Sequence, residues 1–218
     1  MIYLLDSGVE PSLNFCTENF STCGNYTDVI GHGSSMASII KSIHPDAKIS
    51  NVKIGDSKPN LLNIKKCLEY LESKELFENI NIILFNANFP YETLLDEFEA
   101  KLRTLSNKFI IVVPAGNNST DVTSYTPARC NFVWNVGSLN KSNKPTQVTN
   151  FGNESRAIDF WIVSTNTNAI SKDNKKIRVF GTSVAASILA ALIDKHQIID
   201  KIILEKVVNN YNESVSIN

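Results

Sequence analysis

The chain opens with Ile2-Tyr3-Leu4-Leu5-Asp6-Ser7-Gly8, an apolar run that ends in a carboxylate and a turn. Four consecutive apolar residues predict a strand buried on both faces, because a strand with one solvated face alternates apolar and polar residues. Similar apolar runs occur at residues 80–85 and 109–113. Strands of this kind are typical of parallel sheets whose two faces are covered by helices.

Segments with helical spacing alternate with these runs. In residues 61–76, for example, Leu61, Ile64 and Leu68 recur every three or four positions, as on the buried face of an amphipathic helix. We expect strands at 2–5, 49–54, 80–85, 109–113, 132–136, 158–163 and 177–180, and helices at 34–43, 61–76, 93–105, 183–195 and 200–208. This alternation predicts an α/β fold with a doubly wound, mainly parallel central sheet flanked by helices in three α/β/α layers.

Two features describe the organisation of the chain as a whole. Residues 9–30 are polar and rich in turn residues, which indicates a loop. The sequence contains no linker, internal repeat or low-complexity stretch. We therefore expect residues 1–218 to form a single domain.

The charge balance argues against several functional classes. The chain has 21 basic and 22 acidic residues and a formal net charge of −1, which offers no electrostatic attraction to nucleic acid. No apolar run approaches the roughly 20 residues that cross a bilayer, and the first residues do not resemble a signal peptide. We expect a cytoplasmic protein with no membrane span and no nucleic-acid partner, whose oligomeric state stays open.

The cysteines and histidines give no sign of a metal centre. Cys16, Cys23, Cys67 and Cys130 form no CxxC pair and no metal-ligand spacing with the three histidines. We interpret them as free thiols in a reducing compartment, with a Cys16–Cys23 disulfide as the alternative. No metal and no cofactor are expected.

Polar side chains gather where the predicted strands end and the predicted helices begin. Asp6 ends the first strand, Asn86 and Asn117 lie just past two others, and His32 and Ser183 open helices. In doubly wound sheets the ligand site lies at the carboxyl ends of the strands. All five residues are therefore expected on one face.

Asp6, His32 and Ser183 follow one another in a chain order known for nucleophilic serine triads, and each lies beside a glycine or one residue from it. Ser183 is the candidate nucleophile, His32 the general base that takes its proton, and Asp6 the carboxylate that orients the imidazole. The backbone N–H of Ser183 and the side-chain amide of Asn117 are candidate donors to an oxyanion.

Each of these residues has an ordinary explanation when taken alone. Ser183 or its neighbour could be a helix N-cap, His32 a surface histidine, and Asp6 and Asn117 turn residues. Their joint occurrence at strand ends and helix starts favours catalysis. His44 and His196 lack such a setting, and we expect both at the surface.

The motifs around these residues resemble those of subtilisin-like serine proteases, the subtilase family. The family pattern Asp-Ser/Thr-Gly matches Asp6-Ser7-Gly8, and His-Gly-Thr-x-Val-Ala-Gly matches His32-Gly33-Ser34-Ser35-Met36-Ala37-Ser38. Ala-Ala-Gly-Asn matches Pro114-Ala115-Gly116-Asn117, and Gly-Thr-Ser-Met-Ala-x-Pro matches Gly181-Thr182-Ser183-Val184-Ala185-Ala186-Ser187. The resemblance extends from residue 2 to about 195 and implies the family fold with a shallow peptide-binding groove.

The chain also departs from the family pattern. It is shorter than typical subtilases, which implies trimmed loops and calcium-binding insertions, and no prodomain precedes Met1, so we expect a compact form that folds without one. Ser38 and Ser187 replace a glycine and a proline. Asn86-Ala87-Asn88 stands where the family has Ser-Leu-Gly, and we expect it to bind the substrate backbone, with Ala115 and Gly116 beside it.

Asn88 is expected to restrict the pocket for the substrate side chain before the scissile bond (P1), or to make it polar. The segment facing it, residues 56–60, is short, and its Pro59 lacks an N–H donor. The family's Ala-Pro-Gly turn is missing from residues 160–163. These differences concern the substrate and leave the triad intact.

Three functions are compatible with parts of this pattern. The first is a serine endopeptidase acting through an acyl-enzyme on a restricted set of polypeptides. The second is a catalytically weak peptide-binding or scaffold protein on the same fold, suggested by the altered groove. The third, an α/β-hydrolase esterase, requires Gly-x-Ser-x-Gly and the order Ser, Asp, His, and the chain has neither. The intact catalytic positions favour the first.

Overall fold

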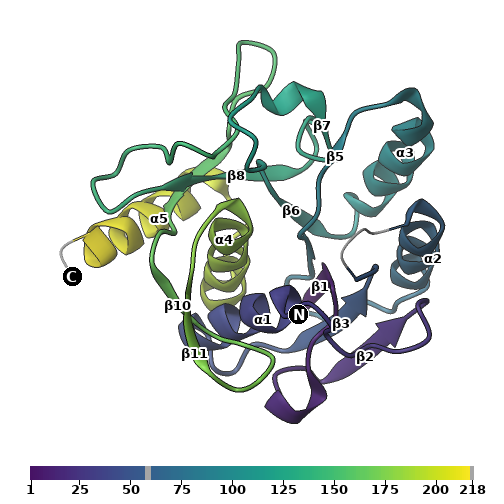
Figure 1. The fold of residues 1–218 in the computed structure, drawn as a ribbon. Coiled ribbons are helices and arrows are strands. Elements are labelled where there is room, and N and C mark those ends of the chain that lie inside the picture. Colours follow the sequence, from purple (N-terminus) through teal and green to yellow (C-terminus); the bar gives the residue numbers. More distant parts are fainter. Residues whose placement is uncertain (57–59, 217–218) are drawn as a thin grey trace.

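The computed structural model describes residues 1–56 and 60–216, and a seven-stranded parallel sheet forms its centre (Figure 1). Neighbouring strands follow the order β2-β3-β1-β4-β6-β8-β9, and every pair is parallel. The strands are β1 (Ile2–Asp6), β2 (Glu18–Ser21), β3 (Ile49–Lys53), β4 (Ile82–Phe85), β6 (Ile110–Pro114), β8 (Trp134–Leu139) and β9 (Phe160–Val163).

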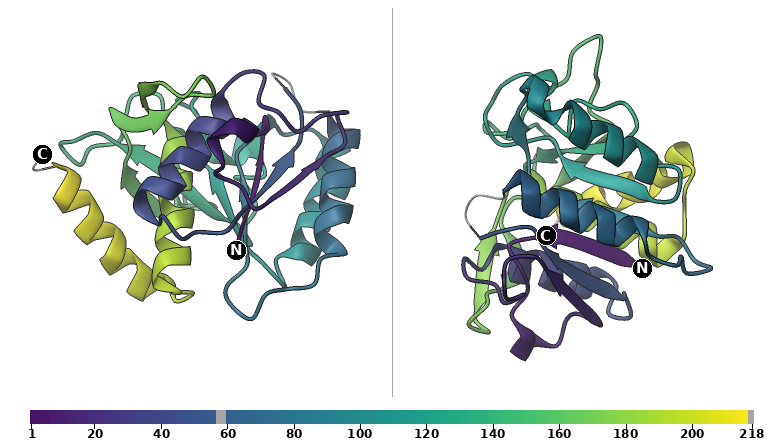
Figure 2. Two further views of the ribbon diagram at one scale, coloured as in Figure 1. Left: turned by 90° about the horizontal axis from the view of Figure 1, so that it is seen from below. Right: turned by 90° about the vertical axis from the view of Figure 1, so that its right-hand side faces the viewer.

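Helices cover both faces of this sheet (Figure 2). They are α1 (His32–Ile43), α2 (Leu61–Glu72), α3 (Asp96–Leu105), α4 (Thr182–His196) and α5 (Lys201–Ser216). On β1, Ile2 and Leu4 belong to the core under α1, α4 and α5, whereas Tyr3 and Leu5 belong to the core under α2 and α3. Side chains of a strand alternate between the two faces, so a strand buried on both sides is apolar throughout. The predicted three-layer fold is confirmed.

Two small antiparallel sheets of two strands each accompany the main sheet. They pair β10 (Thr167–Ile170) with β11 (Lys176–Val179), and β5 (Phe89–Pro90) with β7 (Tyr125–Thr126). Short 3-10 helices occur at Pro11–Leu13, Thr93–Leu95 and Val122–Ser124. In the described part of the chain, no helix is long and apolar enough to cross a membrane.

The structure differs from the predicted elements mainly at the edges. The expected loop over residues 9–30 contains β2, which pairs with β3 as an edge strand. The expected helix over 93–105 begins as a 3-10 turn, and α2 ends at Glu72. The last helix continues to Ser216, and its Asn212 is buried and bonds to the backbone of Trp161 and Val163.

His44 is a second correction. We expected it at the surface, but its side chain is only 23 % exposed and its Nδ1 lies 3.1 Å from Oδ2 of the buried Asp194. The contact with the Asp194 carboxylate stabilises a partly buried imidazole. Local sequence does not reveal this partner, because Asp194 lies 150 residues away in the chain. His196 is exposed, as expected.

Candidate active site

Asp6 and His32 form a direct pair at the carboxyl end of β1. Nδ1 of His32, the first residue of α1, lies 2.7 Å from Oδ1 of Asp6, which is only 4 % exposed. A carboxylate only accepts hydrogen bonds, so this contact places a proton on Nδ1 and leaves Nε2 of the neutral ring as an acceptor. The charge of Asp6 is the main cause that raises the pKa of His32 above its ordinary 6.5, against the opposing effect of burial.

Asp28 holds the start of α1 in place. Its Oδ1 accepts hydrogen bonds from Ser7 Oγ at 2.8 Å and from the Gly31 N–H at 2.7 Å, and its Oδ2 accepts from the Ser34 N–H at 2.8 Å. The first N–H groups of a helix have no partner within the helix, and a carboxylate there also favours the helix dipole. Sequence reasoning missed this role; an acidic residue shortly before a predicted helix is the available signal.

The glycine after His32 is required by close packing. A Cβ on Gly33 would lie 2.1 Å from the carbonyl oxygen of Gly8 and 3.1 Å from Cβ of Asp6. The Gly33 N–H also donates to Ser7 Oγ at 3.1 Å. The turn after β1 and the first turn of α1 are therefore in direct contact, which brings the Asp6 carboxylate to the His32 ring.

Ser183 and Asn117 meet at the start of α4. Ser183 is half-buried in the first turn, and Asn117 Oδ1 accepts both the N–H of Thr182 at 3.0 Å and its hydroxyl at 3.1 Å. These two donors identify the oxygen of the Asn117 amide, so its Nδ2 points elsewhere. Within the described residues, neither that Nδ2 nor the Ser183 N–H has an acceptor. Two free donors thus lie near the serine.

The two halves of the site come together through helix packing. Residues of α1 and α4 belong to the same core cluster. In the part of the chain that the structure describes, no hydrogen bond joins Ser183 Oγ to His32. Catalytic hydrogen bonds are often long in unliganded enzymes and shorten when substrate binds.

A buried amide supports the loop that carries Asn117. Asn150 is fully buried; its Nδ2 donates to the Ala115 carbonyl at 3.0 Å and its Oδ1 accepts the Asn118 N–H at 2.9 Å. Gly116 has a φ of +109°, and a Cβ there would lie 2.3 Å from Asn150 Nδ2. Sequence reasoning missed Asn150, because it lies more than 30 residues from the loop.

The residues expected to bind substrate lie at the ends of β4 and β6. Asn86 is buried, and its Nδ2 is 3.4 Å from Ser187 Oγ on α4. Asn88 Nδ2 donates to the Pro114 carbonyl at 2.6 Å. Ala87 is half-buried, while Ala115 and Gly116 are buried. Pro59, also singled out by sequence, lies outside the described residues.

The two serines that depart from the family pattern each have partners. Ser187 Oγ donates to the Ser183 carbonyl at 2.8 Å. Ser38 Oγ donates to the Ser35 carbonyl and accepts the Ile170 N–H at 2.8 Å, which ties α1 to β10. Both hydroxyls are thus satisfied within the packing around the site.

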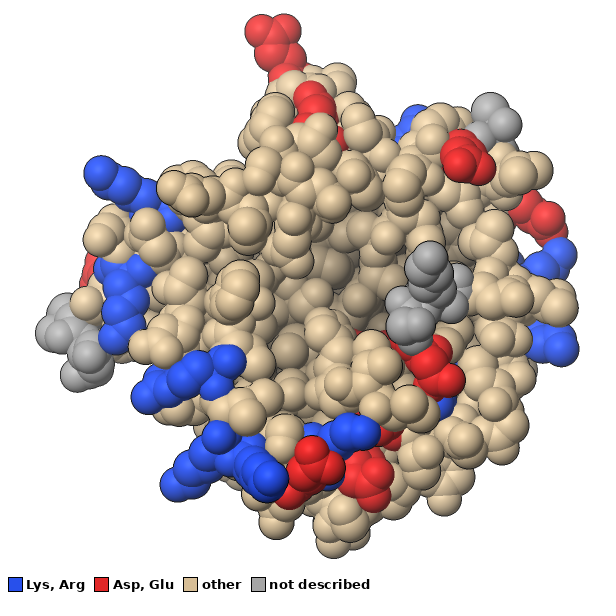
Figure 3. All heavy atoms as spheres, in the orientation of Figure 1, with Lys and Arg blue, Asp and Glu red and all other residues tan. Residues whose placement is uncertain are grey.

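The face of the molecule seen in Figure 1 is hollowed near its middle and carries little charge there. Figure 3 shows a depression near the middle of the face seen in Figure 1, over β6 and α4, with charged side chains mostly toward the margins. A separate cavity of about 470 Å³ lies between α2 and α3, lined by Leu62, Leu94 and Phe98 among others. Across the described residues, no group of three or more His, Cys, Asp or Glu is arranged to hold a metal ion.

Comparisons with known proteins bear on the family and the fold of the chain. The sequence profile of the subtilase family, Peptidase_S8, matches residues 3–196. "Alkaline serine protease ver112" from Corniculantispora psalliotae is 24% identical over 204 residues, which cover 88% of this chain and 52% of that protein. "Putative subtilisin-like proteinase 2" from Encephalitozoon cuniculi (strain GB-M1) is 25% identical over 196 residues, covering 88% of this chain and 34% of that protein.

The chain thus spans about half or less of the length of these relatives. The crystal structure of a cold adapted subtilisin-like serine proteinase superimposes with a TM-score of 0.81 at 17% identity, covering 96% of this chain and 80% of that one. At this identity the likeness concerns the fold. The profile match over most of its length shows the family: the chain belongs to the subtilases.

Proposed function

We propose that the chain is a serine endopeptidase that cleaves peptide bonds through an acyl-enzyme on Ser183. The observation that carries the proposal is the 2.7 Å contact between His32 Nδ1 and Asp6 Oδ1. Asn117 supports it, since its side chain is bound to the first residue of the helix that carries Ser183. A base oriented by a buried carboxylate, a serine and nearby oxyanion donors are the components of acyl transfer.

In the proposed reaction, Ser183 Oγ attacks the carbonyl carbon of the scissile peptide while Nε2 of His32 takes its proton. The resulting oxyanion accepts hydrogen bonds from Asn117 Nδ2 and the Ser183 N–H. Collapse breaks the C–N bond, and His32 returns the proton to the leaving amine. Water then attacks the acyl-enzyme while His32 takes its proton. The bond between the acyl carbon and Ser183 Oγ breaks, His32 returns the proton to Oγ, and the acid product leaves. Asp6 keeps the ring oriented and stabilises the imidazolium.

We also propose that the range of substrates is restricted. Asn88 is held between the ends of β4 and β6 by its bond to the Pro114 carbonyl. Its Oδ1 is buried and has no partner among the described residues. The side chain also takes space that the glycine of the family pattern leaves open.

Labelling and turnover test this function together. A fluorophosphonate should label the parent protein at Ser183, and Ser183→Ala should lose both label and peptidase activity, by roughly 10⁴-fold or more. Ser106→Ala, at the half-buried residue that follows α3, is the control and should behave as the parent. An unlabelled parent would instead support the peptide-binding alternative, and an activity loss below about tenfold in Ser183→Ala would reject Ser183 as the nucleophile.

For the compartment, we propose the cytoplasm on the basis of the thiols. All four cysteines are free, and burial raises the pKa of Cys16, Cys67 and Cys130 to about 12, so little reactive thiolate is present at neutral pH. Protein purified without reductant and then unfolded should show four reactive thiols per chain. A count of two would indicate a disulfide and contradict the proposal.

A further inference from the structure

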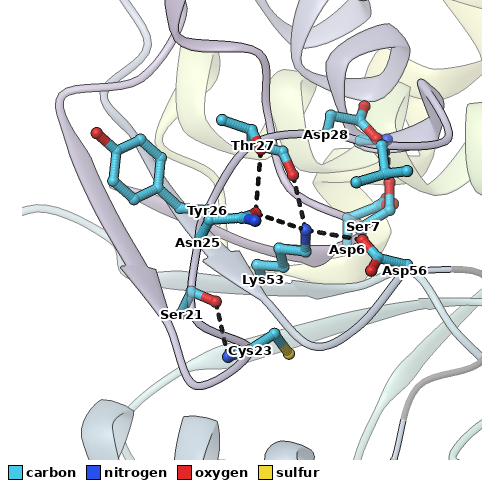
Figure 4. A network of polar contacts seen from close by, with 12 residues as sticks. Asp6, Ser7, Ser21, Cys23, Asn25, Tyr26, Thr27, Asp28, Lys53 and Asp56 are labelled. Atoms are coloured by element: carbon cyan, nitrogen blue, oxygen red, sulfur yellow. Dashed lines mark hydrogen bonds and ion pairs between the residues drawn. The ribbon is translucent and has the colours of Figure 1, made fainter.

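Lys53 is a buried cation beside the candidate triad. It ends β3, where it lies opposite Asp6 in the register of β1 and β3, and its side chain is 1 % exposed. Figure 4 shows its ammonium between three oxygen atoms from the loop after β2 and the turn after β3. Nζ is 3.1 Å from Asn25 Oδ1, 2.7 Å from the Thr27 carbonyl and 2.7 Å from Asp56 Oδ1. An ammonium has three protons, so all of its donors have acceptors.

Burial of this charge demands these partners. An ammonium removed from water is costly unless it is paired and hydrogen-bonded, so Lys53 and its three acceptors form a unit in which each contact depends on the others. Asn25 is exposed and Asp56 is 51 % exposed at its side chain. The lysine therefore holds two surface segments to the end of β3, as a bound metal ion would.

One of these segments leads directly to the histidine. The Thr27 carbonyl that Lys53 binds belongs to the peptide bond before Asp28, and Asp28 accepts the N–H groups of Gly31 and Ser34 on either side of His32. Asp28 also accepts the hydroxyl of Ser7, the residue after Asp6. The position of residues 25–28 thus affects both members of the Asp6–His32 pair.

The backbone of residues 26–27 packs closely against Gly8, in the turn that follows Asp6. A Cβ on Gly8 would lie 2.6 Å from the Tyr26 carbonyl oxygen and 2.7 Å from that of Thr27. Asn51 Nδ2 donates to the same Tyr26 carbonyl at 3.0 Å. The loop backbone therefore lies directly against the turn that follows Asp6, and a displacement of the loop would move that turn.

We propose that Lys53 is a positioning residue for the proposed reaction: its buried ammonium binds Asn25, Thr27 and Asp56, and through Asp28 it sets the direction in which His32 meets Asp6. Lys53 itself touches neither the substrate nor the reacting atoms. The inference rests on the proposed peptidase function for its kinetic consequence, while its geometric consequence can be tested without catalysis.

The kinetic test compares Lys53→Met with Lys74→Met. Lys74 is the control, since it also pairs with a carboxylate, Glu18 at 2.8 Å, but is 25 % exposed and makes its contacts with Glu18 and Tyr70 rather than with residues 25–28. Both variants are compared at a temperature where circular dichroism shows them folded. We expect Lys53→Met to lower kcat by about 10- to 100-fold and to leave KM within about twofold of the parent value. This loss is the scale expected when a catalytic group is misplaced by about 1 Å. Lys74→Met should keep the kcat of the parent.

Chemical rescue separates positioning from general stability. Lys53→Ala leaves space beside three oxygen acceptors, so millimolar methylammonium should restore part of the lost kcat, whereas the larger tetramethylammonium, which has no N–H donor, should not. If Lys53 variants fail to fold, Asn25→Ala tests the proposal instead, because it removes one acceptor of the ammonium at an exposed residue. We expect it to lower kcat too, by a smaller factor than Lys53→Met.

A magnetic resonance measurement keeps the two proposals distinguishable. The proton between His32 Nδ1 and Asp6 should give a far-downfield signal in the parent, which Lys53→Met should broaden or shift and Lys74→Met should leave unchanged. This signal does not depend on peptidase activity, so an inactive parent would refute the proposed function alone. An unchanged signal in Lys53→Met, an unchanged kcat in a folded Lys53 variant or in Asn25→Ala, or equal losses in the Lys74 control would overturn the role of Lys53.

Discussion

Replacing Asp28 with Asn removes one charge at the start of α1 and keeps the size of the side chain. The Asp28 carboxylate, 3 % exposed, accepts the N–H groups of Gly31 and Ser34 and the hydroxyl of Ser7 through its two oxygens. An Asn offers one oxygen and one NH₂ group. Whichever way the amide turns, its NH₂ faces a backbone N–H that it cannot accept, so at least one helix donor loses its partner.

The size of the effect follows from these contacts. Loss of one hydrogen bond to a charged group amounts to roughly 1.5–3 kcal/mol, and loss of the favourable charge at the helix N-terminus to about 0.3–1 kcal/mol. We expect Asp28→Asn to lower the free energy of unfolding by about 2–4 kcal/mol. Urea denaturation at pH 7 measures this difference, with Asp173→Asn at an exposed turn as the control.

Asp28→Asn should also shift the pH dependence of kcat/KM, in a direction that the pKa of His32 determines. The charge of Asp28 contributes to raising the pKa of His32, so its removal lowers that pKa and moves the acid limb of kcat/KM to lower pH. Because the folded-state pKa of His32 is raised above 6.5, protonated His32 adds stability below that pH, and this contribution is lost as the pH rises through the folded pKa. A stability change below about 0.5 kcal/mol, or an acid limb that moves to higher pH, would refute this reasoning.

Three further predictions concern the rest of the site. Asn117→Ala should lower kcat by roughly 10²–10³ at unchanged KM, the range established for such a donor in subtilisin itself; an unchanged kcat in steady-state kinetics would contradict it. Gly33→Ala should destabilise the fold by about 3 kcal/mol or more, since its Cβ would lie 2.1 Å from the Gly8 carbonyl oxygen. Thermal unfolding measures this effect, and an unaltered midpoint would contradict the close contact. Asn88→Gly should widen the range of P1 side chains cleaved in a peptide library, and an identical profile would rule out Asn88 as a specificity determinant.

The central strands could be predicted because they are buried on both faces. A run such as that of β4 has no solvent-facing residues, so its sequence carries a clear signal. The edge strand β2 carries no such sequence signal, since it pairs with β3 alone and has the polar residues of a solvated edge. Strand β10 was not predicted for a similar reason: it has four residues, of which only Ala169 is buried and the first two are polar.

The candidate site divides in the same way. Asp6, His32, Ser183 and Asn117 could be proposed from sequence because each lies within two residues of a glycine at the end of a strand or the start of a helix. The residues that hold them carry no such local mark. Asn150 supports the Asn117 loop through contacts with residues more than 30 positions away, and no short motif encodes them.

The sequence by itself determined which strands are apolar throughout, and which residues are candidates for the proposed acyl transfer and in what order they occur, because periodicity and glycine-flanked motifs are local properties of the chain. Only the tertiary structure decided that His32 meets Asp6 at 2.7 Å and that Asp28 holds the start of the helix that carries His32. It also decided that the buried ammonium of Lys53 binds the loop at residues 25–28. The physical reason is that a hydrogen bond depends on the distance and direction between groups from different elements, which the packing of those elements sets.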